Sequence, residues 1–214
     1  MRYSVLPVPD DVFRLRLHEA VSLYVGAMGY DPSITDARVR AWANASLEPG
    51  WAAVVAVQHP EDVSPADALR NLNCPLAGVA YCVRGQSTQW WHVQVRAGMA
   101  EKRWPLRAVS DVLGDYVELA EIHVHPEHQG ARLGERLLHE LMAGRPESHV
   151  LLSTPEVPDE ANRAWRLYRR LGFTDILRHF NFAGDSRPFA VLGASLPLLA
   201  DAPEPAAPTA EGAP

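Results

Sequence analysis

The sequence has few of the residues that build disulfide or metal scaffolds, with two cysteines, Cys74 and Cys82, in 214 residues. Two cysteines exclude a disulfide-stapled fold and a four-cysteine zinc site. They fit a reducing compartment, so we expect the protein to be cytoplasmic. Cys82 lies inside an apolar run and is expected to be an inert core thiol.

The sequence also lacks an excess of positive charge and any long apolar run. Its 20 basic and 26 acidic residues give a formal net charge of −6. Nucleic-acid binding needs a basic footprint, so no nucleic-acid partner is expected. No stretch approaches the about 20 apolar residues that span a bilayer, and residues 1–11 contain no apolar core of a secretory signal. We therefore expect neither a membrane partner nor secretion.

Composition divides the chain into a globular part and a tail. We expect residues 1–200 to form one domain. Residues 201–214 are rich in Ala and Pro, carry acidic residues and have no large apolar side chain. Such a segment cannot bury enough surface to offset the entropy of ordering, so we expect it to be disordered.

Apolar spacing predicts an α/β (α+β) fold with a mixed central sheet, because strands alternate with helices in the second half while the middle favours antiparallel pairing. The predicted strands are 2–8, 51–57, 76–83, 117–124, 149–152, 173–182 and 189–196. The predicted helices are one from residue 10 or 11 to Gly29, one from Thr35 to before Pro49, two short ones within 86–114, and those at 130–143 and 159–171.

The most informative segment is 118–138, where a predicted strand leads through a polar turn with two glycines into a helix. The N–H groups at the start of such a helix lack intrahelical acceptors, and with the helix dipole they bind anions such as a pyrophosphate. Gly130 would let the backbone approach the anion, and Gly134 could do the same or permit close packing of the helix on the strand. Arg132 and Arg136 could add charge. Neither a Walker nor a Rossmann glycine pattern is present. An ordinary tight turn is the alternative.

A second segment, Asn162-Arg-Ala-Trp-Arg-Leu-Tyr-Arg-Arg-Leu-Gly-Phe173, follows on the next predicted helix. Together the two segments resemble the GNAT superfamily of acyl-CoA-dependent N-acyltransferases. Residues 124–134 are similar to its motif A, Val-x-Pro-x-x-Gln/Arg-x-x-Gly-x-Gly/Ala. Residues 162–173 are similar to its motif B, Asn-x-x-Ala-x-x-Leu-Tyr-x-x-Leu-Gly-Phe. The resemblance covers about residues 117–183, and the N-terminal half matches only in the order of its elements.

The resemblance implies a sheet that splays between its fourth and fifth strands, with acetyl-CoA as the cosubstrate wedged between them. The pantetheine arm would lie along the strand residues Ile122, His123 and Val124. Asn162 matches a motif B residue that commonly contacts the cofactor, and Tyr168 matches one that often protonates the departing thiolate. The amides that would hold the pyrophosphate belong to Gln129, Gly130, Ala131, Arg132, Leu133, Gly134 and Glu135.

One residue departs from motif A, because Arg132 stands where the family usually has glycine. A side chain at that position must point away from the cofactor or reach around to its phosphates.

Two carboxylates on the predicted strand, Glu118 and Glu121, could accept the proton that an amine loses before it attacks a thioester. Glu118 is ranked first, because its distance from Gln129 matches the base position in the histone-acetylating branch of the family. Strict alternation also places Glu118 on the same face as Ile122 and Val124, and Glu121 on the opposite face. The alternative for either acid is a solvated or ion-paired carboxylate.

Three further features each have a functional and a structural interpretation. Tyr168 is either the proton donor or simply a core aromatic residue. Trp90 and Trp91 either line the acceptor pocket or form a small satellite core. The cluster of His123, His125 and His128 resembles part of a metal site, but no further ligand follows at a natural spacing and the family needs no metal, so none is expected.

The sequence thus predicts an N-acetyltransferase that moves an acetyl group from acetyl-CoA to an amine by direct attack in a ternary complex. The acceptor would be a small molecule or a peptide, and the protein a monomer or homodimer. The alternative is a non-catalytic acyl-CoA-binding or regulatory module of the same fold.

Overall fold

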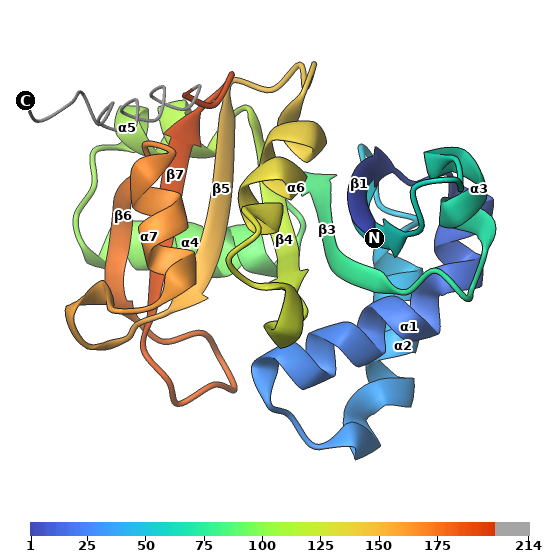
Figure 1. The fold of residues 1–214 in the computed structure, drawn as a ribbon. Coiled ribbons are helices and arrows are strands. Elements are labelled where there is room, and N and C mark those ends of the chain that lie inside the picture. The colour runs from blue at the N-terminus through green and yellow to red at the C-terminus, as the bar shows by residue number, and fades with distance from the viewer. Residues whose placement is uncertain (200–214) are drawn as a thin grey trace, which may run out of the picture.

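A computed structural model describes residues 1–199, and the tail expected at 201–214 lies outside the described residues. Seven strands form one sheet in the order β1-β2-β3-β4-β5-β7-β6 (Figure 1). All neighbouring strands are antiparallel except β4 and β5, which are parallel. The predicted mixed central sheet is therefore confirmed.

The predicted elements occur in the predicted order, with one further short helix between the second and third strands. The strands are β1 Arg2–Pro7, β2 Ala52–His59, β3 Leu76–Arg84, β4 Tyr116–Val124, β5 His149–Pro155, β6 Thr174–Phe180 and β7 Phe189–Ser195. The helices are α1 Asp10–Met28, α2 Thr35–Ala45, α3 Pro65–Arg70, α4 Trp90–Glu101, α5 Leu106–Leu113, α6 Leu133–Met142 and α7 Arg163–Arg170. None of the helices in the described part of the chain is both long and apolar enough to cross a bilayer.

Two helices begin later than predicted. The spacing placed their starts at residues 130 and 159, whereas α6 begins at Leu133 and α7 at Arg163. Before α7 the chain makes a 3₁₀ turn at Pro158–Glu160, and the Asn162 side chain then accepts a hydrogen bond from the Trp165 N–H at 2.9 Å. Asn162 is therefore the N-cap residue, a role that favours Asn and fixes where a helix starts.

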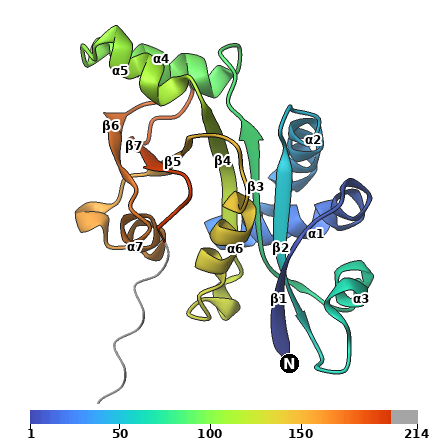
Figure 2. The same cartoon turned by 90° about the horizontal axis from the view of Figure 1, so that it is seen from above.

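Three apolar clusters pack the helices onto the sheet. The largest buries Leu137 and Leu138 of α6 and Trp165 of α7 against residues of β2 to β5 and β7. A second cluster packs α1, α2 and α3 on β2 and β3. The third packs α4 and α5 on β5, β6 and β7. Figure 2 shows α6 and α7 on one side of β4 and β5, with α4 and α5 on the other.

The sheet splays between β4 and β5, as the resemblance implied. The two strands pair only at Tyr116↔His149, Val117↔Val150 and Glu118↔Leu151. Beyond this point β4 keeps pairing with β3 and β5 keeps pairing with β7. Since each strand keeps an antiparallel partner on its outer side, the two can separate without losing the rest of the sheet.

A β-bulge in β4 changes which residues share a face. Tyr81 of β3 pairs with Glu121 while its neighbour Cys82 pairs with Leu119, so Ala120 is the extra residue. Val117 and Leu119 face α6 and α7 before the bulge, and Ile122 and Val124 face them after it. Strict alternation is therefore wrong across this strand: Glu118 does not share a face with Ile122 and Val124, but lies on the same side as Glu121.

Replacing the cap residue of α7 tests the helix start. Asn162→Ala should lower the free energy of unfolding by about 1 kcal/mol, because the Trp165 N–H loses its acceptor. Asn162→Asp keeps an acceptor at a helix N-terminus and should lose much less. Urea denaturation of the three proteins measures the difference. Unchanged stability of Asn162→Ala together with weaker acetyl-CoA binding would instead assign the residue to the cofactor.

Candidate active site

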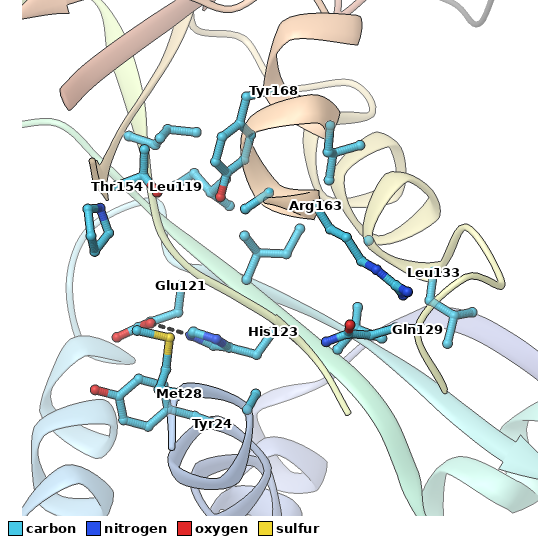
Figure 3. A pocket seen from close by; sticks show the side chains of 18 of the residues that line it. Tyr24, Met28, Leu119, Glu121, His123, Gln129, Leu133, Thr154, Arg163 and Tyr168 are labelled. Carbon is cyan, nitrogen blue, oxygen red and sulfur yellow. Dashed lines mark hydrogen bonds and ion pairs between the residues drawn. The ribbon is translucent and has the colours of Figure 1, made fainter. Parts of the chain in front are cut away.

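A cavity of about 600 Å³ lies where β4 and β5 separate. Its walls come from Leu119 to Val124 of β4, Leu152 to Pro155 of β5, the loop before α6, and one face of α7. The end of α1 and the segment before β7 close one end of it. In Figure 3, Tyr168 and Glu121 lie across the cavity from each other, and Gln129 and Leu133 mark the end with the loop.

The loop before α6 has the geometry of an anion site. Gly130 has φ 95°, a conformation that suits glycine, although a Cβ there would meet nothing within 4 Å. Backbone shape, and not lack of space, therefore selects glycine at this position. Among the described residues, the N–H groups of Leu133, Gly134 and Glu135 find no acceptor. These donors and the helix dipole fit a pyrophosphate.

Arg132 also adopts the left-handed backbone conformation, with φ 54° and ψ 21°. This conformation explains why a glycine is common at the equivalent family position. The Arg132 side chain turns onto α6, where its Nη2 lies 2.9 Å from Oε1 of Glu135. Glu135 is only 5% exposed and also pairs with Arg170 of α7. The Glu135 carboxylate is thus paired with one arginine of the loop and one arginine of α7.

Gly134 has a packing role, the second of the two roles considered for it. A Cβ at Gly134 would lie 3.3 Å from Cδ2 of Leu167 on α7 and 3.8 Å from Cγ2 of Val124 on β4. The small residue therefore lets α6 lie close to both elements at the cavity edge.

Most of the predicted cofactor-binding residues line the cavity. They are Ile122, His123, Val124, Gln129, Gly130, Arg132, Leu133, Gly134 and Glu135. Ala131 and Asn162 are not among the lining residues. Asn162 precedes Tyr168 by six residues, one fewer than in motif B, and its Oδ1 caps the helix.

The two acidic residues have different surroundings. Burial, and secondly the negative charge of Glu121, raise the pKa of Glu118 to about 8. Glu118 is not a lining residue, whereas Glu121 lines the cavity. Nε2 of His123 lies 2.6 Å from Oε2 of Glu121, and the His123 ring packs on Tyr24 with centroids 4.8 Å apart. Glu121 is therefore held in place from its own strand.

Tyr168 combines the two interpretations considered for it. Its ring is buried in the largest apolar cluster and packs on Phe173, with centroids 5.6 Å apart. Its hydroxyl points into the cavity (Figure 3) and makes no hydrogen bond with another described residue. Burial, and secondly the charge of Glu121, raise the pKa of the phenol. The phenol therefore stays protonated at neutral pH, as a proton donor has to be.

Trp90 and Trp91 lie outside the cavity lining. Trp91 is buried in the third cluster, packs on Tyr116 and donates from Nε1 to Oγ of Ser153 at 3.2 Å. Trp90 is 56% exposed and packs on Phe182. Their positions favour the satellite core over the acceptor pocket.

The remaining candidate groups are the histidines near the end of β4 and the buried thiol of Cys82. His125 accepts from the Glu127 N–H and His128 bonds to the Tyr3 hydroxyl. The rings of His125 and His128 pack with centroids 5.3 Å apart, whereas His123 is paired with Glu121. No group of three or more metal-ligating side chains occurs within residues 1–199. Cys82 is fully buried, and burial raises the pKa of its thiol to about 11. It is therefore unsuited to act as a nucleophile.

Sequence reasoning missed two sets of lining residues. Arg163 and Arg166 of α7 line the cavity near the loop, and the motif match gave them no role. At the other end lie Tyr24, Met28, Tyr30, Arg38 and Arg187. Spacing along α1 predicted only its buried face, and nothing local in the sequence connects residues 24–38 with residue 187.

Comparisons with known proteins agree with this geometry. A family profile described as "Acetyltransferase (GNAT) domain" matches residues 92–175. A GCN5-like protein acetyltransferase of Mycobacterium tuberculosis is 44% identical over 206 residues, which cover 92% of this chain and 100% of the relative.

Two solved structures share the fold. The YncA protein of Salmonella typhimurium, a putative acetyltransferase solved with acetyl-CoA, matches with a TM-score of 0.55 at 19% identity, covering 98% of this chain and 99% of that one. The ribosomal-protein-S18-alanine N-acetyltransferase of Escherichia coli matches with a TM-score of 0.56 at 15% identity, covering 91% and 94%.

The loop conformation can be tested by a pair of alanine substitutions. Gly130→Ala should lower the free energy of unfolding by about 1–2 kcal/mol, because alanine is strained at a positive φ. Gly26→Ala is the matched control: it lies in α1, also with nothing within 4 Å of a Cβ, and should raise stability by about 0.5–1 kcal/mol. Chemical denaturation measures both. Equal effects at the two positions would show that residue 130 does not need its left-handed conformation.

Proposed function

Because the chain belongs to the GNAT family of acetyltransferases, we propose that it transfers the acetyl group of acetyl-CoA to a primary amine of a protein. The observation that carries the proposal is the cavity between β4 and β5, which has an anion-binding loop at one end and a buried tyrosine hydroxyl in its wall. The expected site of action is the cytoplasm.

Different parts of the cavity wall suit the phosphates and the pantetheine arm of acetyl-CoA. The α6 N-terminus, with Arg163 and Arg166 nearby, suits the phosphates. Since β4 and β5 stop pairing after Glu118, the β4 backbone groups that face β5 are free to bond the amides of the pantetheine arm. Acetyl-CoA supplies the activated acetyl group, and the chain supplies positioning and proton transfer.

Two observations favour a protein amine over a small-molecule amine. The relative that is 44% identical along its whole length is named a protein acetyltransferase. The acceptor end of the cavity is bounded by the end of α1, by α2 and by the segment before β7. Arg38 on this rim is exposed, so its side chain is accessible to a protein that docks there.

The proposed reaction is a direct attack. The amine nitrogen bonds to the thioester carbonyl carbon, the carbon–sulfur bond breaks, and the thiolate takes a proton from the Tyr168 hydroxyl. A carboxylate removes the proton of the attacking amine. Glu118 is the first candidate for this role, because a pKa of about 8 makes it a stronger base than an ordinary carboxylate. It would act through water, since it does not line the cavity. Glu121, which does, is the alternative.

The pH dependence of kcat/KM distinguishes the two acids. The wild-type profile should rise with an inflection near pH 8, where Glu118 loses its proton. Glu118→Gln should remove this inflection and lower kcat/KM by about 100-fold. Glu121→Gln should instead shift the inflection to lower pH, because it removes a negative charge that raises the pKa of Glu118. Loss of the inflection in Glu121→Gln, with its retention in Glu118→Gln, would make Glu121 the base.

The proposed proton donor and the cofactor site are tested together. Acetyl-CoA at a hundred times its Kd should stabilise the protein by about 2.7 kcal/mol, or roughly 5–10 °C. Tyr168→Phe should keep this thermal shift but lower kcat by about 100-fold or more, measured as amine-dependent thiol release. No thermal shift with the wild-type protein would contradict the proposed cofactor, and unchanged kcat in Tyr168→Phe would contradict the proposed donor.

A further inference from the structure

The acceptor end of the cavity is built by three segments that are distant in the sequence. Tyr24 and Met28 come from the end of α1, Arg38 from α2, and Arg187 from the segment before β7. Figure 3 shows Tyr24 and Met28 beside Glu121 and His123, away from Gln129 at the loop end. An amine that reaches the thioester from this end passes the tyrosine ring and the carboxylate of Glu121.

Aromatic packing fixes Arg38 at this end. Arg38 and Trp42 are four residues apart on α2 and therefore share one face of the helix. Trp42 is 2% exposed and packs on Tyr24 and Tyr81, with centroids 5.5 Å and 5.0 Å away. The Arg38 guanidinium carbon lies 5.7 Å from the centroid of the Tyr24 ring. The arginine is thus positioned by a buried cluster, although its own charge is exposed.

The two arginines at this end differ in their charge balance. Arg187 is neutralised: its Nη2 lies 2.6 Å from Oδ2 of Asp185, and its Nη1 donates to the Tyr30 hydroxyl at 3.3 Å. Arg38 forms no ion pair with any carboxylate of residues 1–199. One arginine that has no carboxylate partner within residues 1–199 therefore lies on the acceptor rim.

The same end of the cavity also has a negative charge in its wall, that of Glu121. Burial raises the pKa of both Tyr24 and Tyr81; the negative charge of Glu121 adds to this increase and the positive charge of Arg38 opposes it. Glu121 has 20% of its side chain exposed and is hydrogen-bonded to His123. The acceptor end thus offers an anion in the cavity, suited to the amine, and a cation at the rim.

We propose that the acceptor amine lies in an acidic stretch of the substrate protein, with a neighbouring Asp or Glu side chain that pairs with Arg38 while the amine lies near Glu121. The inference rests on the proposed protein acceptor. The same arrangement disfavours polyamines and basic peptide tails, because a second positive charge beside the amine would meet Arg38. A guanidinium is well suited to this role, since its planar donors match a carboxylate.

The test compares matched peptides. Each contains one lysine in a blocked peptide, or a free N-terminus in a lysine-free peptide, and the flanking residues are Glu, Gln or Arg. For an exposed pair the wild-type kcat/KM should favour Glu over Gln flanks by about threefold to fivefold, and Gln over Arg. The preference should shrink in 0.5 M salt, because exposed charges are screened.

Variants on α2 assign the preference to one side chain. In Arg38→Gln the ratio of kcat/KM between Glu and Gln flanks should fall to about one, and in Arg38→Lys part of the preference should return. Arg40→Gln is the control: Arg40 is exposed on the same helix but does not line the cavity, and its substitution should leave the ratio unchanged. Melting temperatures check that each variant is folded.

The outcomes separate the inference from the proposed function. Equal kcat/KM for all flanks, or a preference that persists in Arg38→Gln, overturns the inference while peptide acetylation still supports a protein acceptor. If no peptide is acetylated while small amines release thiol from acetyl-CoA, the protein acceptor itself is wrong, and the inference falls with it.

Discussion

The separation of β4 from β5 is the constraint on which the rest of the site depends. Three residue pairs hold the strands together at one end, and beyond them each strand is held by its outer neighbour, β3 or β7. Backbone groups of β4 that would otherwise bond to β5 therefore face a cavity. The packing of Trp165 and Tyr168 on α7 against β5 and α6 supports this opening. A ligand with amide groups of its own can complete the hydrogen bonding that the sheet leaves unfinished.

The charges in the cavity follow from this opening and from the bulge in β4. One extra residue, Ala120, brings Glu118 and Glu121 to the same side of the sheet, where burial, and secondly the charge of Glu121, raise the pKa of Glu118. The result is a buried carboxyl group with a raised pKa that does not line the cavity, and a second carboxyl group, hydrogen-bonded to His123, that does. At the opposite end the N-terminus of α6 and the arginines of α7 suit an anion. The cavity therefore has positive charge where the phosphates are expected and a carboxyl group where the amine is expected.

Predictions from the sequence succeeded where a local pattern has one structural solution. Glycines mark the ends of helices at Gly29 and Gly172, both with positive φ. The turn around Gly130 was correct in type and place. Predictions failed where an irregular element, such as a 3₁₀ turn or a β-bulge, interrupts the regular spacing of apolar residues. Helix α7 starts later than predicted because a 3₁₀ turn precedes its cap, and the predicted face of Glu118 was wrong because a bulge breaks the alternation. Trp91 turned inward because α4 packs on the sheet.

By itself the sequence determined the fold class, the family resemblance and the residues of the loop before α6, because these depend on neighbours within one segment: a strand, a turn with glycines and an amphipathic helix. Only the tertiary structure decided the acceptor end, which brings Tyr24, Arg38, Glu121 and Arg187 together from four separate parts of the chain. It also decided which charges stay unbalanced, since Asp185 neutralises Arg187 while Arg38 is placed by the packing of Trp42. Such contacts between side chains depend on how the helices and strands pack, and residue spacing in the sequence does not predict them.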